Sequence, residues 1–355
     1  MRGVPHDRAP WGTGQNGHML AVDALNEIGF WLERSSAPSF KVAAFRTAAR
    51  TVSTLTEDEL AARSRDGRLT TLKGIGGRTS EVIAQAVAGE VPAYLADLRE
   101  RNAEPLTTGG AALLPQLRGD LHAHSEWSDG TTTIEQLLHG AELLGREYLA
   151  LTDHSPNLTI ANGLSVERLT EQLDVVAAVN DRGGPVRLLS GIEVDILESG
   201  ELDQSPEMLD RLDVVVASVH SKLRSDRATM TERMLGAIRT PRTNVLGHCT
   251  GRLVAGPRAP RAQSEFDAEA VFAACAEHDV AVEINSRPER QDPPDDLLRI
   301  AIDAGCLFSI DTDAHAPGQL DYLGYGAERA ERAGVPAERI ITTWPADRLV
   351  EWARG

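Results

Sequence analysis

Short apolar runs that end in a histidine or an acidic residue recur from residue 119 onward, and they constrain the fold more than any other feature of this sequence. Polar residues end these runs at positions 122, 154, 193, 220, 248, 283 and 313, which lie 27 to 39 residues apart. Each interval suits one strand followed by one helix. About seven such units predict a closed or distorted α/β barrel with functional groups at the C-terminal ends of its strands. An open doubly wound sheet is the alternative, but the glycine-rich phosphate fingerprint usual after its first strand is absent.

Six of the ten histidines stand at the ends of these runs. Residues two apart on a strand point the same way, so His122 and His124 face one cavity, as do Asp313 and His315. A single histidine in such a place is more often a hydrogen-bonded structural residue, but six together favour a metal site. Imidazole and carboxylate ligands suit zinc, manganese or iron, not calcium. Nine candidate ligands are too many for one tetrahedral ion and predict a site of two or three divalent ions. They are His122, His124, Asp129, His154, Glu193, His220, His248, Asp313 and His315.

The segments GDLHAHSEWSDG, LALTDHS, GIEVDI, SVHS, GHCTGR, EINSRPER and DTDAH resemble, in order and spacing, the motifs of the polymerase and histidinol phosphatase (PHP) superfamily. The resemblance covers about residues 119 to 350. It implies a distorted (β/α)7 TIM-like barrel, up to three metals held by the nine residues above, and phosphoester hydrolysis by a metal-activated hydroxide. One departure is Cys249, where relatives more often carry proline. This residue either alters only the loop or brings a thiolate near the metals.

Further residues near the motifs have candidate roles in catalysis or substrate binding. Arg252 is a candidate clamp for phosphate oxygens, because a guanidinium fork can meet two of them; the alternative is a surface salt bridge. Asp153 precedes a candidate ligand, so it can orient a histidine or relay a proton. The resemblance implies that the segment with Glu283, Asn285 and Arg287 shapes the substrate pocket. The alternative is that these are ordinary polar residues of a loop.

Residues 18–101 are predicted to be helical throughout, with Ala24, Leu25, Ile28 and Leu32 on one face of the first helix. The segments FKVAAFRTAAR and LKGIGGRTSEVIAQAVAGE resemble the N-terminal helix-hairpin-helix domain of family X DNA polymerases. A Gly-Ile-Gly hairpin presents backbone N–H groups at a helix N-terminus, which suits a DNA phosphate without reading base sequence. A tight turn in a structural docking domain is the alternative. The candidate DNA-binding residues are Lys41, Arg46, Lys73, Gly74, Gly76 and Arg78.

Two departures from family X limit what this module is expected to do. Val82 stands where lyase-active relatives carry a Schiff-base lysine, and valine cannot form an imine. In bacterial relatives the polymerase palm and fingers lie between the helical module and the metal domain, whereas residues 102–118 alone separate them here. Neither lyase nor nucleotidyl transfer activity is therefore expected. The expected organisation is a flexible tail (1–17), a helical domain (18–101), a linker (102–118) and the phosphoesterase domain (119–355).

Charge and composition bear on location and partners. The net charge is −17, but residues 1–101 carry 13 basic against 12 acidic residues and the remainder 23 against 41. A near-neutral module can approach DNA, whereas the acidic body needs bound cations to admit an anionic substrate. The absence of a secretory signal or a membrane-span pattern predicts a cytoplasmic protein without a membrane partner. Three widely spaced cysteines do not suggest a disulfide framework.

Together these features predict a metal-dependent phosphoesterase acting on DNA 3′ ends, as a 3′-5′ exonuclease or a 3′-phosphatase. One alternative is a small-molecule phosphomonoesterase of the histidinol-phosphatase type. Another is a DNA-binding adaptor that keeps metal for stability alone, but a purely structural site needs fewer ligands than nine. The sequence leaves the oligomeric state open.

Overall fold

The structure is a computed structural model that describes residues 19–256 and 259–355. The predicted flexible tail, residues 1–17, lies outside the described residues. The chain divides into two compact units at Pro105 and Leu106, and each is described by itself. None of the helices among the described residues is both long and apolar enough to cross a membrane.

The first unit is all helical, as predicted. Its elements are α1 (Ala21–Arg34), α2 (Ser39–Ser53), α3 (Glu57–Arg65), η1 (Leu69–Thr71), α4 (Gly77–Val87) and α5 (Ala93–Arg101). Helix α3 begins with a reciprocal capping box, in which Thr56 Oγ1 accepts from Glu59 N and Glu59 Oε2 accepts from Thr56 N. The apolar face predicted for the first helix is buried, with Leu25 and Ile28 fully covered.

The hairpin between α3 and α4 is fixed by glycine geometry. Gly74 has a φ of +87°, and a Cβ there would lie 2.7 Å from Thr47 Cγ2 on α2. Only glycine suits such a position. Ile75 is buried, whereas Gly74 and Gly76 are exposed. The hairpin thus shows its backbone to solvent while its one large side chain joins the core.

The second unit is a barrel of seven parallel strands in sequential order, so the predicted β/α repeat is confirmed. The strands are β1 (Gly119–Ala123), β2 (Tyr148–Leu151), β3 (Arg187–Asp195), β4 (Val214–Ser218), β5 (Val245–Leu246), β6 (Ala281–Asn285) and β7 (Phe308–Asp311). Gly119 pairs with Tyr148 at one end of the order, and Val282 pairs with Phe308 at the other. The ring closes where His124 N donates to Ala314 O (2.7 Å) and Ala314 N donates to His122 O (3.3 Å).

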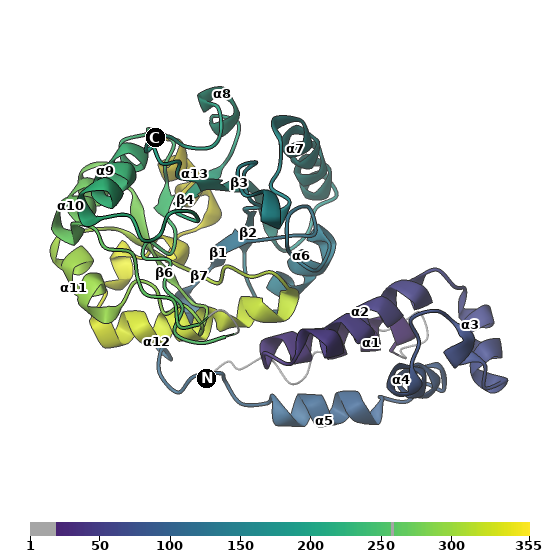
Figure 1. Ribbon diagram of the computed structural model, residues 1–355. Helices are drawn as coiled ribbons and strands as arrows, with labels where there is room; N and C mark the ends of the chain where they lie inside the picture. The colour runs from purple at the N-terminus through teal and green to yellow at the C-terminus, as the bar shows by residue number, and fades with distance from the viewer. Residues whose placement is uncertain (1–18, 257–258) are drawn as a thin grey trace. The chain divides into compact units, whose positions relative to one another are not determined.

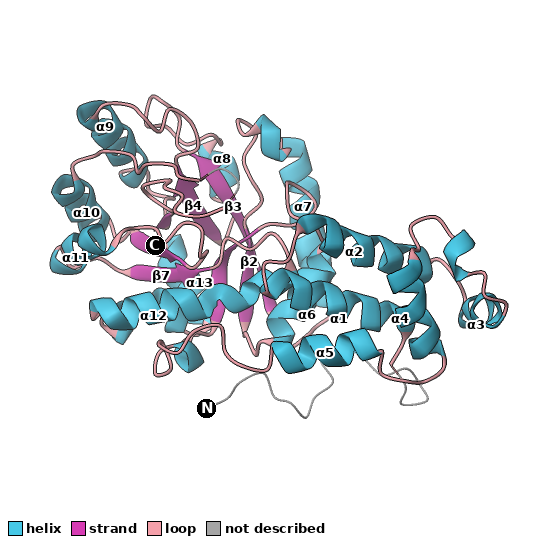
Figure 2. Ribbon diagram, turned by 60° about the horizontal axis from the view of Figure 1, so that its bottom comes forward, coloured by secondary structure: helices cyan, strands magenta, loops and turns pink. Residues whose placement is uncertain are grey.

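Helices surround this ring of strands (Figures 1 and 2). They are α6 (Ile134–Leu143), α7 (Val166–Asp181), α8 (Pro206–Leu209), α9 (Arg227–Ile238), α10 (Ala268–Glu277), α11 (Asp295–Asp303), α12 (Leu323–Ala333) and α13 (Ala346–Arg354). Short 3₁₀-helices complete the fold: η2 (Leu114–Gln116), η3 (Thr159–Ala161), η4 (Pro317–Tyr322), η5 (Ala337–Arg339) and η6 (Ile341–Thr343).

The barrel interior is filled with apolar side chains. Leu121, Tyr148 and Val216 form one buried cluster with Trp344 and with Leu349 of α13. The barrel is therefore packed inside.

The predicted linker, residues 102–118, differs from the observed division. From Leu106 onward it belongs to the second unit, where Leu113 and Leu117 are buried in the main core. Glu331 on α12 accepts hydrogen bonds from the backbone amides of Gly110 (2.9 Å) and Leu113 (2.7 Å). The Pro, Gly and Thr content suggested a linker. The sequence did not reveal that this segment is held in place, because the carboxylate that holds it lies more than 200 residues away.

Candidate metal centre

All nine predicted ligands meet at the C-terminal ends of the strands. Their donor atoms form four overlapping groups, each with all atoms within 4.8 Å of one another. The groups are His124, Asp129, His154 and His315; His122, His124 and Asp313; His122, Glu193 and His248; and His154, Glu193 and His220. Parallel strands all end at one mouth of the barrel, which brings together residues that are far apart in the sequence.

Glu193 on β3 lies at the centre of this cluster and is 1% exposed. Its carboxylate oxygens lie 2.8 Å from a ring nitrogen of His154 and 2.8 Å from one of His248. The corresponding distances are 3.4 Å to His122 and 3.2 Å to His220. His124 Nε2 lies 3.6 Å away, so this single carboxylate approaches five imidazoles, which suits a group shared between neighbouring ions.

Many of these atoms are close to one another without forming hydrogen bonds. Among the described residues, eight buried atoms of the cluster have no hydrogen-bond partner: His122 Nε2, both ring nitrogens of His124 and of His248, His154 Nδ1, and both oxygens of Glu193. Buried polar atoms without partners carry a desolvation penalty and are rare. Lone pairs that converge in this way fit divalent cations, so the residues present suit the group that the sequence predicts.

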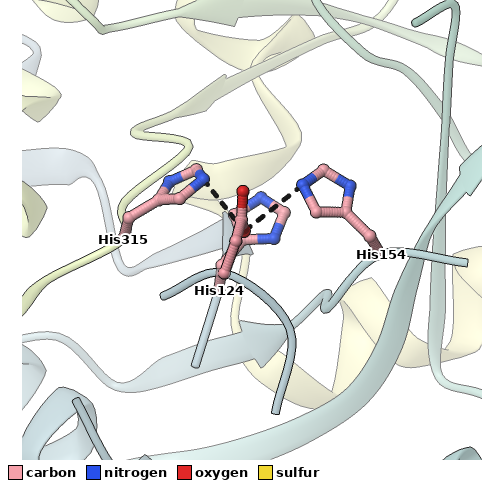
Figure 3. Close-up of side chains that lie close together, drawn as sticks. His124, His154 and His315 are labelled. Carbon is pink, nitrogen blue, oxygen red and sulfur yellow. Dashed lines mark ion pairs between the residues drawn. The ribbon is translucent and has the colours of Figure 1, made fainter. Parts of the chain in front are cut away.

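Asp129 is the most exposed of the nine, with 37% of its side chain accessible. It lies on the loop between β1 and α6, 3.5 Å from His154 Nε2 and 3.3 Å from His315 Nε2. The rings of His154 and His315 lie on either side of His124 in Figure 3. This group is therefore the one most open to solvent and to a substrate.

Burial and the neighbouring charges shift the pKa values of the clustered residues in different directions. Burial lowers the pKa of His154, but the carboxylates of Glu193 and Asp129 outweigh it and raise the pKa to about 10. Burial likewise opposes a charge on His122, yet Glu283 and Glu193 raise its pKa well above the usual value. The pKa of His124 falls to about 3 because it is buried beside His315 and His154. Despite burial, the pKa of Glu193 lies well below its usual range because histidines surround it.

A second layer of polar groups orients these histidines. Glu283 on β6 is fully buried, with Oε1 at 2.6 Å from His122 Nδ1 and Oε2 accepting from His248 N at 2.5 Å. Asn285 donates to Glu283 Oε2 (3.2 Å) and to Asp313 Oδ2 (3.4 Å), and is also fully buried. Both were predicted to bind substrate. The structure instead places them behind the ligands, where such partners fix ring orientation.

Arg287, the third predicted substrate contact, lies at the edge of the cluster with 20% of its side chain exposed. It donates to the backbone oxygen of Asp313 at 2.9 Å, and its Nη1 lies 3.1 Å from His315 Nδ1.

The two predicted catalytic residues, Arg252 and Asp153, form hydrogen bonds with residues outside the nine clustered ligands. Arg252 donates through Nε to Arg290 O (3.1 Å) and through Nη2 to Gln291 O (2.5 Å), so two nitrogens of its guanidinium hold a loop, and its role as a phosphate clamp stays a prediction. The Asp153 carboxylate accepts from Ser125, Ser128 and Gln172, and these contacts include no histidine. Cys249 lies in none of the four groups, and its thiol is 3.7 Å from Asp292 Oδ1.

Two residues near the cluster were missed by the sequence analysis. Asp195 Oδ1 accepts from His220 N (3.2 Å) and lies 3.3 Å from His220 Nδ1. Asp195 lies two residues after Glu193 on β3 and so shares its face, a spacing that could have revealed it. The second residue is Arg290, which donates from Nε to Asp313 Oδ2 at 2.9 Å. No periodic pattern in the sequence identifies Arg290 as a residue of the site.

The candidate DNA-binding residues divide into exposed and buried. Lys41, Lys73 and Arg78 are exposed, as are the hairpin glycines. Arg46 is 4% exposed and pairs with Glu33, with Nε donating to Oε1 at 2.9 Å and Nη2 to Oε2 at 2.8 Å. Its prediction as a DNA contact is therefore wrong, because the guanidinium is inside the helical unit.

Comparison with known proteins matches both units. The model of the PHP domain matches residues 120–287. A "Probable phosphatase" of Aeromonas hydrophila is 30% identical over 236 residues, which span 64% of this chain and 89% of that protein. The chain belongs to the PHP family. The PHP match begins within β1 and ends just after β6, so it includes seven of the nine clustered residues.

The helical unit matches the model of a helix-hairpin-helix domain over residues 16–91. The "DNA polymerase/3'-5' exonuclease PolX" of Bacillus subtilis is 34% identical over 228 residues, which span 64% of this PHP protein and 39% of that relative. Among solved structures, a histidinol phosphate phosphatase from Lactococcus lactis, complexed with zinc, L-histidinol and phosphate, has a TM-score of 0.45 and 18% identity. It covers 61% of this chain and 94% of its own.

Proposed function

We propose that this chain is a metal-dependent phosphoesterase that uses two or three divalent ions, of zinc, manganese or iron, bound by the nine clustered residues. The coarse activity, hydrolysis of a phosphoric ester, follows from membership of the PHP family. The observation that carries the metal proposal is the convergence of buried donor atoms that lack hydrogen-bond partners. When bound, the ions would lower the pKa of a water molecule and neutralise the charge on phosphate oxygens.

The protein's own residues set the geometry for this chemistry. Glu283 and Asp195 hold His122 and His220 in fixed ring orientations, and Glu193 connects two of the groups. Arg290, held against Asp313 and 17% exposed, is the cation that we assign to the substrate phosphate. A guanidinium anchored through one nitrogen keeps further donors for a second partner.

We further propose that the substrate is the 3′ end of DNA. Support comes from the match to a helix-hairpin-helix model and from the exposed hairpin carrying Lys73, Gly74, Gly76 and Arg78. Gly77 and Arg78 begin α4, where N–H groups lack intrahelical acceptors and can meet a phosphate. The proposal includes no polymerase step, since the two units follow one another directly at Pro105 and Leu106 and leave no room between them for a polymerase domain.

A small phosphomonoester is the second candidate substrate. Support comes from the Aeromonas relative named a probable phosphatase, which is covered over 89% of its length. The two candidates share a metal centre and differ in what the first unit contributes.

A turnover assay distinguishes these possibilities. The wild type, loaded with manganese or with zinc, is given 3′-tailed DNA, 3′-phosphorylated DNA and a generic phosphomonoester. We expect turnover of a DNA substrate, its loss in His220→Ala, and its retention in His278→Ala, which removes an exposed histidine outside the cluster. Turnover of the phosphomonoester alone would favour the second candidate. A metal-loaded protein inert on all three would refute the enzyme assignment in favour of an adaptor.

Binding of 3′-tailed DNA to the full chain tests the hairpin. Lys73→Ala should weaken binding for every sequence and reduce the slope of log affinity against log salt concentration by about one. Arg239→Ala, an exposed cation of the second unit, is the matched control and should leave the slope unchanged. Affinity that does not vary with salt would contradict phosphate contact.

A further inference from the structure

The loop that carries Asp129 is fastened from one side by a buried carboxylate. This loop, Ser125–Gly130, is a tight turn in which Gly130 N donates to Ser125 O at 2.9 Å, and a Cβ on Gly130 would lie 2.3 Å from His124 O. Asp153 accepts from Ser125 N (2.9 Å), Ser125 Oγ (2.7 Å) and Ser128 Oγ (2.5 Å). All three side chains are at most 8% exposed.

Helix α7 completes this fastening through two residues one turn apart. Gln172 is 2% exposed and donates from Nε2 to Asp153 Oδ2 at 2.6 Å. Arg168 donates to the backbone oxygens of Asn162 (2.8 Å) and Trp127. Residues four apart on a helix share a face, so one side of α7 holds both the Asp129 loop and the loop that follows His154.

We propose that Gln172 and Arg168 are positioning residues for Asp129, and that α7 completes the metal group of His124, Asp129, His154 and His315. Asp129 lies further from a strand than the other two clustered carboxylates: β1 ends at Ala123, whereas Glu193 is in β3 and Asp313 lies two residues after the end of β7. Its approach to His154 and His315 therefore depends on how firmly that loop is held. This inference rests on the proposed metal-binding function.

The inference has a specific consequence for metal affinity. Gln172→Leu keeps the size of the side chain but removes the amide donor, which leaves Asp153 one hydrogen bond short. Loss of a partner that orients a ligand typically weakens metal binding by about 10- to 100-fold. The group that contains Asp129 should be affected most. The group of His122, Glu193 and His248 shares no residue with it and should keep its affinity.

The experiment titrates the full-length, metal-free protein with Mn²⁺ and follows affinity and stoichiometry by calorimetry. We expect Gln172→Leu and Arg168→Met to weaken one binding step, as Asp129→Ala does, and Glu171→Gln on the exposed side of α7 to behave as wild type. Urea unfolding of each variant identifies the conditions under which it is folded.

A double variant separates positioning from a general structural role. If Gln172 acts through Asp129, Gln172→Leu has no further effect on Mn²⁺ binding in the Asp129→Ala background. An equal effect in both backgrounds would overturn the inference. So would wild-type Mn²⁺ binding in Gln172→Leu and Arg168→Met when Asp129→Ala is impaired. A wild type that binds no Mn²⁺ at all would instead refute the proposed metal function.

Discussion

Replacing Glu283 with glutamine tests whether the second layer of the site sets its metal affinity. The carboxylate joins two ligands of one group, since Oε1 lies 2.6 Å from His122 Nδ1 and Oε2 accepts from His248 N. With a metal on His122 Nε2, His122 Nδ1 carries a proton and must donate. A glutamine offers one acceptor and one NH₂, so in either orientation an N–H donor of His122 or His248 faces another donor.

The magnitude follows from the contact that is lost. A hydrogen bond to a charged group contributes about 1.5–3 kcal/mol. Because 1.36 kcal/mol corresponds to a factor of ten, this amounts to a weakening of roughly 10- to 100-fold, in the range typical for partners of metal ligands. The assay is competition for Zn²⁺ against a chelator of known affinity. Glu277→Gln, exposed near the end of α10, is the matched control. A Zn²⁺ affinity within a factor of two of wild type would refute the orienting role of Glu283.

Three further outcomes are expected. Glu193→Gln should reduce the metal content by more than one ion, because Glu193 belongs to two groups. Mass spectrometry measures the metal content, and loss of only one ion would show that Glu193 is not shared between ions. Zn²⁺ binding at pH 7.5 should release protons, and the Zn²⁺ affinity should rise with pH. The reason is that His154 has a pKa of about 10 and must be neutral to bind metal. Calorimetric binding enthalpies that are the same in buffers of different ionisation enthalpy would contradict this expectation. Arg46→Met should destabilise the first unit by about 1.5–3 kcal/mol, because the buried carboxylate of Glu33 loses its hydrogen bonds to the guanidinium. Urea unfolding measures this change, and an unchanged stability with weaker DNA binding would restore Arg46 as a DNA contact.

The barrel and the nine clustered residues could be predicted because both follow from local rules. Strand ends recur at intervals of one βα unit, and residues two apart on a strand share a face. His122 and His124 illustrate this, since both rings reach the same cavity. The same rule applies to Glu193 and Asp195, so the partner of His220 was within reach of the sequence.

What could not be predicted is which polar residue faces the substrate and which faces another ligand. Glu283 and Asn285 lie at the end of a strand, as a substrate contact would, but they point into the space behind His122 and Asp313. Arg252 follows a ligand motif, yet the loop that it holds lies about 40 residues further along the chain. These assignments depend on contacts between segments distant in sequence, which no local pattern encodes.

Arg46 shows the same limit within a helix. It lies three residues before Ala49, a spacing that places it on the buried stripe of α2 with Phe45 and Val52. The periodicity therefore marked it as inward-facing, but a buried arginine requires a partner, and Glu33 comes from another helix. Without knowledge of the Glu33 contact, a basic residue near a predicted DNA-binding hairpin is interpreted as a phosphate contact.

The charge of the cluster explains how an acidic body can bind an anionic substrate. From residue 102 onward the chain has 23 basic and 41 acidic residues, a background that repels phosphate. The cluster itself contributes three carboxylates, from Asp129, Glu193 and Asp313, while its imidazoles are neutral when they bind metal. Two divalent ions would already exceed that negative charge, and Arg290 beside Asp313 adds to the excess. Binding of phosphate is therefore expected to depend on bound metal, because the ions reverse the sign of the local field at the mouth of the barrel.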